Sequence, residues 1–284
     1  MLWDAVTFGP ARRRRWMRRQ LRRLDHVDAG GRPRGKRSAR LVVGVFTAML
    51  VLVAAGCSLA YQDPDTFHLF RHLSRLGAAH TSSGSYSFEM AQPGAPSRPV
   101  AFNPCRAIQL EVNDAGAPAP ADALLREALD TVSEASGLEF RIVGDSSQSP
   151  PEHRLASATA GFPQRRRPAL VAWTTPAVDP GLQGDVAGLG GSRPLRDQVS
   201  GQLYYATGEV SLDAPDLTLM LAQRNGRELV RAVIVHELGH LVGLAHVQDP
   251  AELMYAHNVG QVDLGPGDRA GLRVLGSGPC VGLR

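Results

Sequence analysis

The spacing of apolar and polar residues after residue 100 predicts alternating strands and helices. Residues 107–112 alternate strictly between the two classes, which is the period of a half-buried strand, and residues 138–143 repeat that alternation. Between them, residues 121–136 place apolar side chains on one helical face, and Gly137 marks the end of that helix. The continuous apolar run at residues 169–173 fits a central strand.

Two further strands are predicted over Val186 to Gly190 and Glu209 to Asp213, followed by a helix from about Gly226 to Gly243. A last helix is expected after Leu264. This order of strand, helix, several strands and two helices predicts an α/β domain over residues 101–284.

The first 40 residues form an arginine-rich tail. They contain 13 Lys and Arg against three Asp, a net charge of about +10, whereas the whole chain carries +4. The remainder is therefore acidic, at about −6. The basic charge belongs to the tail, and it gives no reason to expect that the folded part binds nucleic acid.

An uncharged apolar segment runs from Leu41 to Ala60. At about 1.5 Å per residue, such a helix matches the hydrocarbon core of a bilayer, which is about 30 Å thick. We therefore predict a transmembrane signal-anchor. Because positive flanks stay in the cytoplasm, residues 1–40 would be cytoplasmic and residues 61–284 would lie outside a single-pass cell-membrane protein.

A lipoprotein anchor is the alternative for this segment. Small residues precede Cys57, as in bacterial signals whose apolar stretch is cleaved and whose cysteine then carries lipid. Residues 61–100, rich in Ser, Gly and Pro in their second half, predict a juxtamembrane stem. Either anchor leaves residues 101–284 as a folded domain tethered outside the membrane.

The candidate chemistry lies in one contiguous motif, H-E-x-x-H-x-x-G-x-x-H, from His236 to His246. On a helix, His236 and His240 lie one turn apart on one face, and Glu237 can reach a water without binding the metal itself. Gly243 can take the positive φ that ends a helix, so that His246 returns as a third ligand. Three neutral imidazoles leave one tetrahedral position open, which is typical of a catalytic zinc.

A second signal follows the motif. Leu253-Met254-Tyr255 stands with Met254 eight residues after His246. Together these features resemble the metzincin metallopeptidases, and most closely the matrixins, whose Met-turn stands at this spacing. A weaker likeness continues over residues 264–272, which are similar to the start of the matrixin C-terminal helix.

The resemblance implies a metzincin-like catalytic domain with a mixed twisted sheet, a zinc-binding active-site helix, a Met-turn and a C-terminal helix. One catalytic zinc would lie on His236, His240 and His246, over an apolar floor formed by Met254. Glu237 would be the general base of a zinc-dependent endopeptidase that cleaves protein or peptide substrates outside the cytoplasm.

Two further site features follow from the same likeness. Tyr255 could stabilise the oxyanion, although family tyrosines near the Met-turn stand at differing offsets. The substrate-binding edge strand is expected at Val186, Ala187, Gly188, Leu189 and Gly190. Its glycines would leave room for a peptide to pair with the backbone as an added strand.

Three cysteines are present, and Cys57 belongs to the apolar segment. In an oxidising compartment we expect Cys105 and Cys280, which bracket the folded region, to form a disulfide. The alternative is that Cys105 caps the zinc, like the cysteine switch of matrixin propeptides. That switch is P-R-C-G in matrixins, whereas here the residues are Asn103-Pro-Cys-Arg106.

The chain also departs from the matrixin pattern. Matrixins hold a second, structural zinc with several histidines, and here His153 is the only histidine of the folded region before the catalytic helix. We therefore expect that second zinc site to be absent. Scattered acids could bind structural calcium, but loop carboxylates are usually just solvated and we assign no calcium site; these acids are Asp179, Asp185, Asp213 and Asp216.

Two rival functions are open. One is a catalytically inactive metzincin-fold binding protein, and the other is a zinc hydrolase that acts on non-peptide envelope material. The three ligands, the base, the glycine and the methionine are all present, which favours the peptidase. We expect a monomer, and the sequence does not indicate which side chain its specificity pocket accepts.

Overall fold

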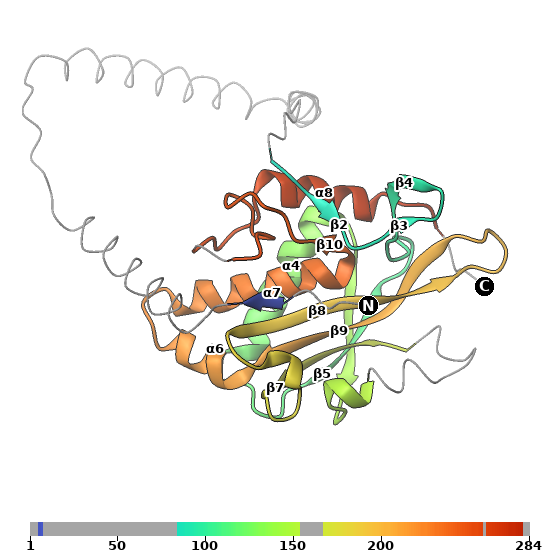
Figure 1. The fold of residues 1–284 in the computed structure, drawn as a ribbon. Helices are drawn as coiled ribbons and strands as arrows, with labels where there is room; N and C mark the ends of the chain where they lie inside the picture. Colours follow the sequence, from blue (N-terminus) through green and yellow to red (C-terminus); the bar gives the residue numbers. More distant parts are fainter. Residues whose placement is uncertain (1–4, 8–83, 154–166, 258–259, 281–284) are drawn as a thin grey trace, which may run out of the picture. The chain divides into compact units, whose positions relative to one another are not determined.

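Residues 5–7, 84–153, 167–257 and 260–280 are described by the computed structural model, in which they appear as the coloured ribbon of Figure 1. They all belong to one compact unit of the chain. Most of the arginine-rich tail, the apolar segment 41–60 and Cys57 lie outside the described residues.

Strands of one mixed sheet form the base of the fold, in the order β1-β8-β9-β7-β5-β6. Strands β6, β5, β7 and β9 run parallel, whereas β8 pairs antiparallel with β9 on one side and with β1 on the other. The bounds are β1 Ala5–Thr7, β5 Ile108–Asn113, β6 Phe140–Asp145, β7 Ala169–Thr174, β8 Val186–Arg196 and β9 Leu203–Asp213.

The helices are α4 Ala121–Ser136, α6 Ala214–Leu221, α7 Gly226–Val242 and α8 Pro266–Gly276, and a short 3-10 helix, η2, spans Pro180–Leu182. Helix α7 packs on β8 and β9 and against α4, which in turn contacts α8 (Figure 1). The sheet and these helices enclose the main hydrophobic core.

Helix α7 is buried almost all round, since 13 of its 17 residues are buried. Its apolar residues include Ile234, Leu238 and Leu241, each fully buried. Burial of a large apolar side chain contributes about 1.5–3 kcal/mol, so this packing holds the helix firmly on the sheet. Three polar side chains of α7, those of His236, Glu237 and His240, are buried with it, and buried polar groups normally have partners inside the protein.

The predicted α/β fold is confirmed, with a mixed sheet, a central helix and a C-terminal helix. Helix α4 matches the predicted residues, because its apolar face and the C-capping Gly137 agree. Strands β8 and β9 are longer than predicted, because the hairpin continues into partly polar residues with a bulge between Arg193 and Pro194. Helix α6 was not predicted; Asp213 caps it by accepting a hydrogen bond from Asp216 N at 3.2 Å.

Residues 84–100 differ from the expected stem, because they pair with the folded domain. Strand β2 (Ser87–Phe88) pairs antiparallel with β10 (Leu244–Ala245), and β3 (Ala91–Gln92) forms a hairpin with β4 (Ala95–Pro99). The Gln92 side chain donates to the carbonyl of Leu203 at 2.7 Å and accepts from its N–H at 2.9 Å. Backbone pairing needs no apolar pattern, so a composition rich in Ser, Gly and Pro concealed these strands.

The expected single-pass membrane localisation needs correction. No helix among the described residues is long and apolar enough to cross a membrane. The segment 41–60, on which that expectation depended, lies outside the described residues.

The predicted disulfide between Cys105 and Cys280 is present, with the two Cα atoms 5.7 Å apart. It joins the segment before β5 to the end of the described chain after α8, across 175 positions of sequence. The sulfur that a cysteine switch would need is thereby bonded to another cysteine.

Replacing both cysteines by serine is expected to lower the free energy of unfolding by about 2–5 kcal/mol, because the bond closes a long loop. Urea unfolding of the oxidised wild type and of the double variant measures the difference. A reductant should destabilise the wild type and leave the double variant unchanged. Equal unfolding midpoints for the two oxidised proteins would show that the bond contributes nothing to stability.

Candidate metal centre

The end of helix α7 and the loop after it bring three histidines together. His236 and His240 lie one turn apart and are both buried. The helix stops at Gly243, whose φ of 118° is a left-handed conformation that glycine adopts without a Cβ clash. The Gly243 N–H donates to the carbonyls of Gly239 and His240, both at 3.1 Å. The chain then reverses through β10 and returns His246 to the other two.

The Nε2 atoms of the three rings form a nearly equilateral triangle. The distance from His236 to His240 is 3.1 Å, from His236 to His246 3.1 Å and from His240 to His246 3.2 Å. A tetrahedral zinc with bonds of about 2.0–2.1 Å separates its nitrogens by about 3.3–3.4 Å. The triangle therefore fits such an ion with only a small adjustment.

The opposite sides of the rings support the same conclusion. Nδ1 of His236 donates to the Leu253 carbonyl at 2.8 Å, and Nδ1 of His240 donates to the Leu244 carbonyl at 2.9 Å. A proton on Nδ1 leaves the Nε2 lone pair facing the centre of the triangle. Lone pairs that face one another repel unless a cation lies between them. This donor set could hold a metal ion, and it is the one such cluster of His, Cys, Asp or Glu within the described ranges.

The surroundings favour uncharged imidazoles on two of the three histidines. Burial lowers the pKa of His236 well below its ordinary value, and burial with nearby His240 and His257 lowers the pKa of His246 to about 3. Burial also opposes charge on His240, but Glu89 and Glu237 outweigh it and raise that pKa. Neutral imidazole is the form that binds metals.

Glu237 is the buried acid of the site. Its side chain is fully buried, and neither carboxylate oxygen has a hydrogen-bond partner in the described structure. Burial raises its pKa to about 8, partly offset by His240. An unpartnered carboxylate inside a protein is costly, so such groups are retained where they serve chemistry.

The loop after His246 runs beneath α7. Met254 is buried, and its sulfur lies 2.7 Å from where a Cβ at Gly239 would stand, directly against the histidine helix. Asp268, near the start of α8, accepts hydrogen bonds from the N–H groups of Leu253 and Met254 at 2.6 and 3.3 Å. The predicted Met-turn is therefore anchored to the C-terminal helix.

Residues 196–275 match the family model described as Matrixin. This segment is matrixin-like. It contains β9, α6, α7, the histidine loop, the Met-turn and nearly all of α8, so the resemblance to the matrixins is confirmed where the candidate site lies. The matrixin-like segment supports a zinc metallopeptidase-like domain.

Solved structures add only distant likenesses. A structure titled "GM1 bound form of the ECX AB5 holotoxin" is 13% identical over 69% of this chain and 92% of its own, with a TM-score of 0.39. The archaemetzincin of Methanopyrus kandleri is 18% identical over 58% of this chain and 93% of its own, with a TM-score of 0.37. No curated protein matches the chain.

Tyr255 and the expected substrate strand are the two remaining predicted features of the site. Tyr255 is half-buried, with its ring 5.7 Å from that of His257. Residues Val186 to Gly190 form the first half of β8, which α7 crosses. A Cβ on Gly188 would lie 2.7 Å from Cγ of Glu237, and a Cβ on Gly190 would overlap the Glu237 main-chain carbonyl. The glycines therefore make room for the histidine helix rather than for a peptide.

Gly190→Ala is expected to destabilise the protein by about 1–3 kcal/mol, because the added methyl group forces α7 away from β8. Chemical unfolding measures the loss. Gly144→Ala in β6 is the matched control, since a Cβ there meets no atom within 4 Å. If the two variants unfold alike, the close approach at Gly190 does not constrain the helix.

Two of the four acids considered for calcium, Asp179 and Asp213, accept hydrogen bonds within the protein. Buried Asp179 accepts hydrogen bonds from Ser211 Oγ at 2.9 Å and from Gly181 N at 3.3 Å, and Asp213 caps α6. Buried His153 faces Glu209, with Nδ1 3.4 Å from Oε2. These contacts explain why the residues are buried without assigning a metal to them.

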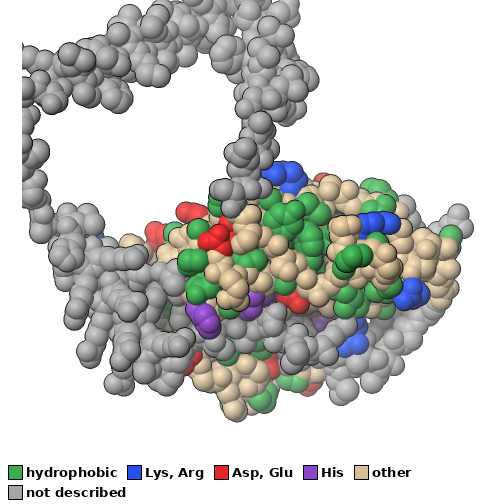
Figure 2. Space-filling model, turned by 45° about the horizontal axis from the view of Figure 1, so that its top comes forward, with side chains coloured by type: hydrophobic (Ala, Val, Ile, Leu, Met, Phe, Trp, Pro, Cys, Tyr) green, Lys and Arg blue, Asp and Glu red, His purple; other side chains and the backbone are tan. Residues whose placement is uncertain are grey.

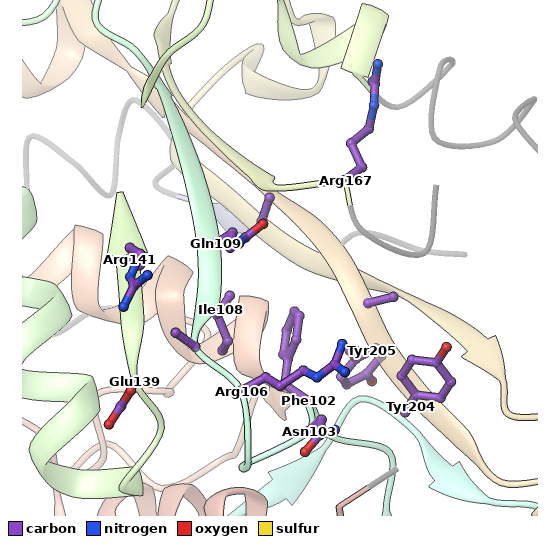
Figure 3. A pocket seen from close by; sticks show the side chains of 13 residues that line it. Phe102, Asn103, Arg106, Ile108, Gln109, Glu139, Arg141, Arg167, Tyr204 and Tyr205 are labelled. Atoms are coloured by element: carbon purple, nitrogen blue, oxygen red, sulfur yellow. The ribbon is translucent and has the colours of Figure 1, made fainter. Parts of the chain in front are cut away.

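A cavity of about 520 Å³ lies elsewhere, between the starts of β5, β6 and β7 and the start of β9 (Figure 3). Arg106, Arg141 and Arg167 line it together with Phe102 and Tyr204. None of its lining residues belongs to the histidine triad.

In the space-filling view, histidine side chains reach the surface among hydrophobic ones on the face shown (Figure 2).

Sequence inspection missed Glu89, which directly follows β2 (Ser87–Phe88) and contacts the site. Its Oε1 lies 3.1 Å from Nδ1 of His240, although the residues are 151 positions apart. It also missed buried Glu252, which accepts hydrogen bonds from the N–H groups of Gly267 and Asp268 at 2.9 Å each. No local motif marks either acid. The sequence offered one signal for Glu252, namely Gly267 and Asp268 at the start of α8, whose N–H groups donate to it.

Proposed function

We propose that the chain is a zinc-dependent endopeptidase whose metal is held by His236, His240 and His246. One observation carries the proposal: three Nε2 atoms converge within 3.2 Å of one another beside a buried carboxylate that has no hydrogen-bond partner. The three histidines would hold the metal, and Glu237 would act as the base at the place where the substrate reacts. The matrixin match over residues 196–275 supports the reaction class.

A bound zinc would polarise the scissile carbonyl and acidify the attacking water. Glu237 takes the proton of that water on a carboxylate oxygen while the water oxygen bonds to the carbonyl carbon. Glu237 then delivers the proton to the departing nitrogen as the C–N bond breaks. No hydrogen-bond donor among the described residues competes for the carboxylate. Tyr255 is the candidate for a hydrogen bond to the oxyanion.

The outer edge of β8 is the proposed site for an extended peptide. Strand β1 pairs antiparallel there, opposite Val186 and Leu189, and this pairing supports the placement of an added strand at the edge. Main-chain hydrogen bonds give such pairing its affinity whatever the side chains are. A substrate on this edge would take the place of β1 and lie beside the helix that carries Glu237.

Cleavage of a diverse peptide library by the zinc-loaded full-length chain tests the proposal. Internal peptide bonds should be cut, cleavage should stop with a zinc chelator, and added zinc should restore it. A chain that binds zinc and cuts no peptide would be better explained as a metzincin-fold binding protein. Cleavage confined to non-peptide envelope substrates would contradict the peptidase assignment.

A further inference from the structure

A carboxylate from outside the histidine motif contacts the metal centre. Glu89 follows β2, and its Oε1 lies 3.1 Å from Nδ1 of His240, on the side of the ring opposite the triangle of Nε2 atoms. The Glu89 side chain is 27% exposed, whereas that of His240 is fully buried. The contact therefore joins a partly solvated acid to a buried ligand candidate.

The backbone fixes Glu89 in this place. Phe88 and Ser87 pair with Leu244 and Ala245 of β10, the short strand between the end of α7 and His246. The Glu89 N–H donates to the carbonyl of Gly243 at 3.0 Å, which continues the ladder to the helix end. The segment that carries Glu89 is thus bonded to the same turn that returns His246 to the site.

Glu89 differs in charge from the other acceptors on these rings. Nδ1 of His236 donates to the carbonyl of Leu253, and Nδ1 of His240 donates to the carbonyl of Leu244 as well as facing Glu89. Both carbonyls are neutral, and each already accepts a hydrogen bond from an Nδ1 proton. The tautomer of His240 therefore does not require Glu89. What the carboxylate adds is a negative charge on the far side of the ring, and acidic partners of this kind raise the basicity of a histidine ligand.

We propose that Glu89 is a positioning residue whose carboxylate strengthens metal binding by His240 through its charge. The proposal rests on the metal site of the proposed function and adds to that site a residue from outside the matrixin-like segment. It also gives β2 a role, because the strand holds the acid in contact with a ligand from which it is far removed in sequence.

Zinc affinity of the full-length chain, measured by competition with a chelating indicator, tests the proposal without any peptide substrate. Glu89→Ala is expected to weaken zinc binding by about 10–100-fold, the usual cost of losing an outer partner of a ligand. Glu89→Gln should also bind zinc clearly more weakly than the wild type, because the amide keeps a hydrogen-bond acceptor but lacks the charge. Ser87→Ala, a change on β2 that leaves the backbone pairing intact, should bind zinc like the wild type.

Unfolding of the three metal-free variants separates positioning from plain structural support. Comparable stability of the metal-free wild type and Glu89→Gln, with weaker zinc binding by the variant, supports the proposal. Wild-type zinc affinity in Glu89→Gln would overturn it, whatever Glu89→Ala does, because the hydrogen bond would then suffice. If the wild-type chain binds no zinc at all, the proposed function fails first, so the two failures are distinguishable.

Discussion

Glu237→Gln is expected to lower the rate of peptide cleavage by about 10²–10⁴-fold, the usual contribution of a general base. The amide has nearly the same shape as the carboxylate but cannot accept the proton of the attacking water. The metal should remain bound, because the three Nε2 atoms that would hold it belong to the histidines. The fold should also remain, since neither Glu237 oxygen accepts a hydrogen bond from the described residues.

The experiment compares kcat, KM, zinc content and unfolding for the wild type and the variant. Glu228→Gln is the matched control. It is the same substitution in the first turn of the same helix, where the side chain is exposed. It should leave cleavage within a few-fold of the wild type. A fully active Glu237→Gln variant with normal zinc content would exclude Glu237 as the base.

The metal-binding half of the site could be predicted because its geometry is local. His236, Glu237 and His240 lie within two turns of one helix, and helical spacing alone places them on adjoining faces. Gly243 and the Met-turn add fixed offsets, which is why the contiguous motif and its surroundings were enough to predict the cluster. Helix α4 was predictable for the same reason, since its apolar face and C-cap are neighbours in sequence.

The remaining parts depend on pairing between distant segments. Glu89 reaches His240 across 151 positions, through a two-residue strand whose composition resembles a linker. A pattern of apolar residues cannot specify which backbone will pair with β10, because the hydrogen bonds involve main-chain groups common to every residue. Gly188 and Gly190 show a second limit: their presence was evident, but only packing shows that α7 is what they accommodate.

His246→Ala is expected to weaken zinc binding by far more than the roughly 10–100-fold cost of losing an outer partner such as Glu89, because it removes a direct donor. Of the three histidines it is also the one that the fold tolerates best, since it is half-buried in a loop, while His236 and His240 are buried in the core. Loss of metal in this variant would therefore report on the ligand itself and not on a damaged helix.

The thermal midpoint gives an independent measure of the same binding. Free zinc at 100 times its Kd stabilises a folded protein that alone binds it by about 2.7 kcal/mol, so the wild-type midpoint should rise with zinc. The midpoint of His246→Ala should stay nearly constant over the same zinc range, whereas His257→Ala, with an imidazole outside the triad, should respond like the wild type. A zinc-dependent midpoint that survives in His246→Ala would place the metal on other residues, and the endopeptidase proposal would then lose the open three-histidine site on which its chemistry depends.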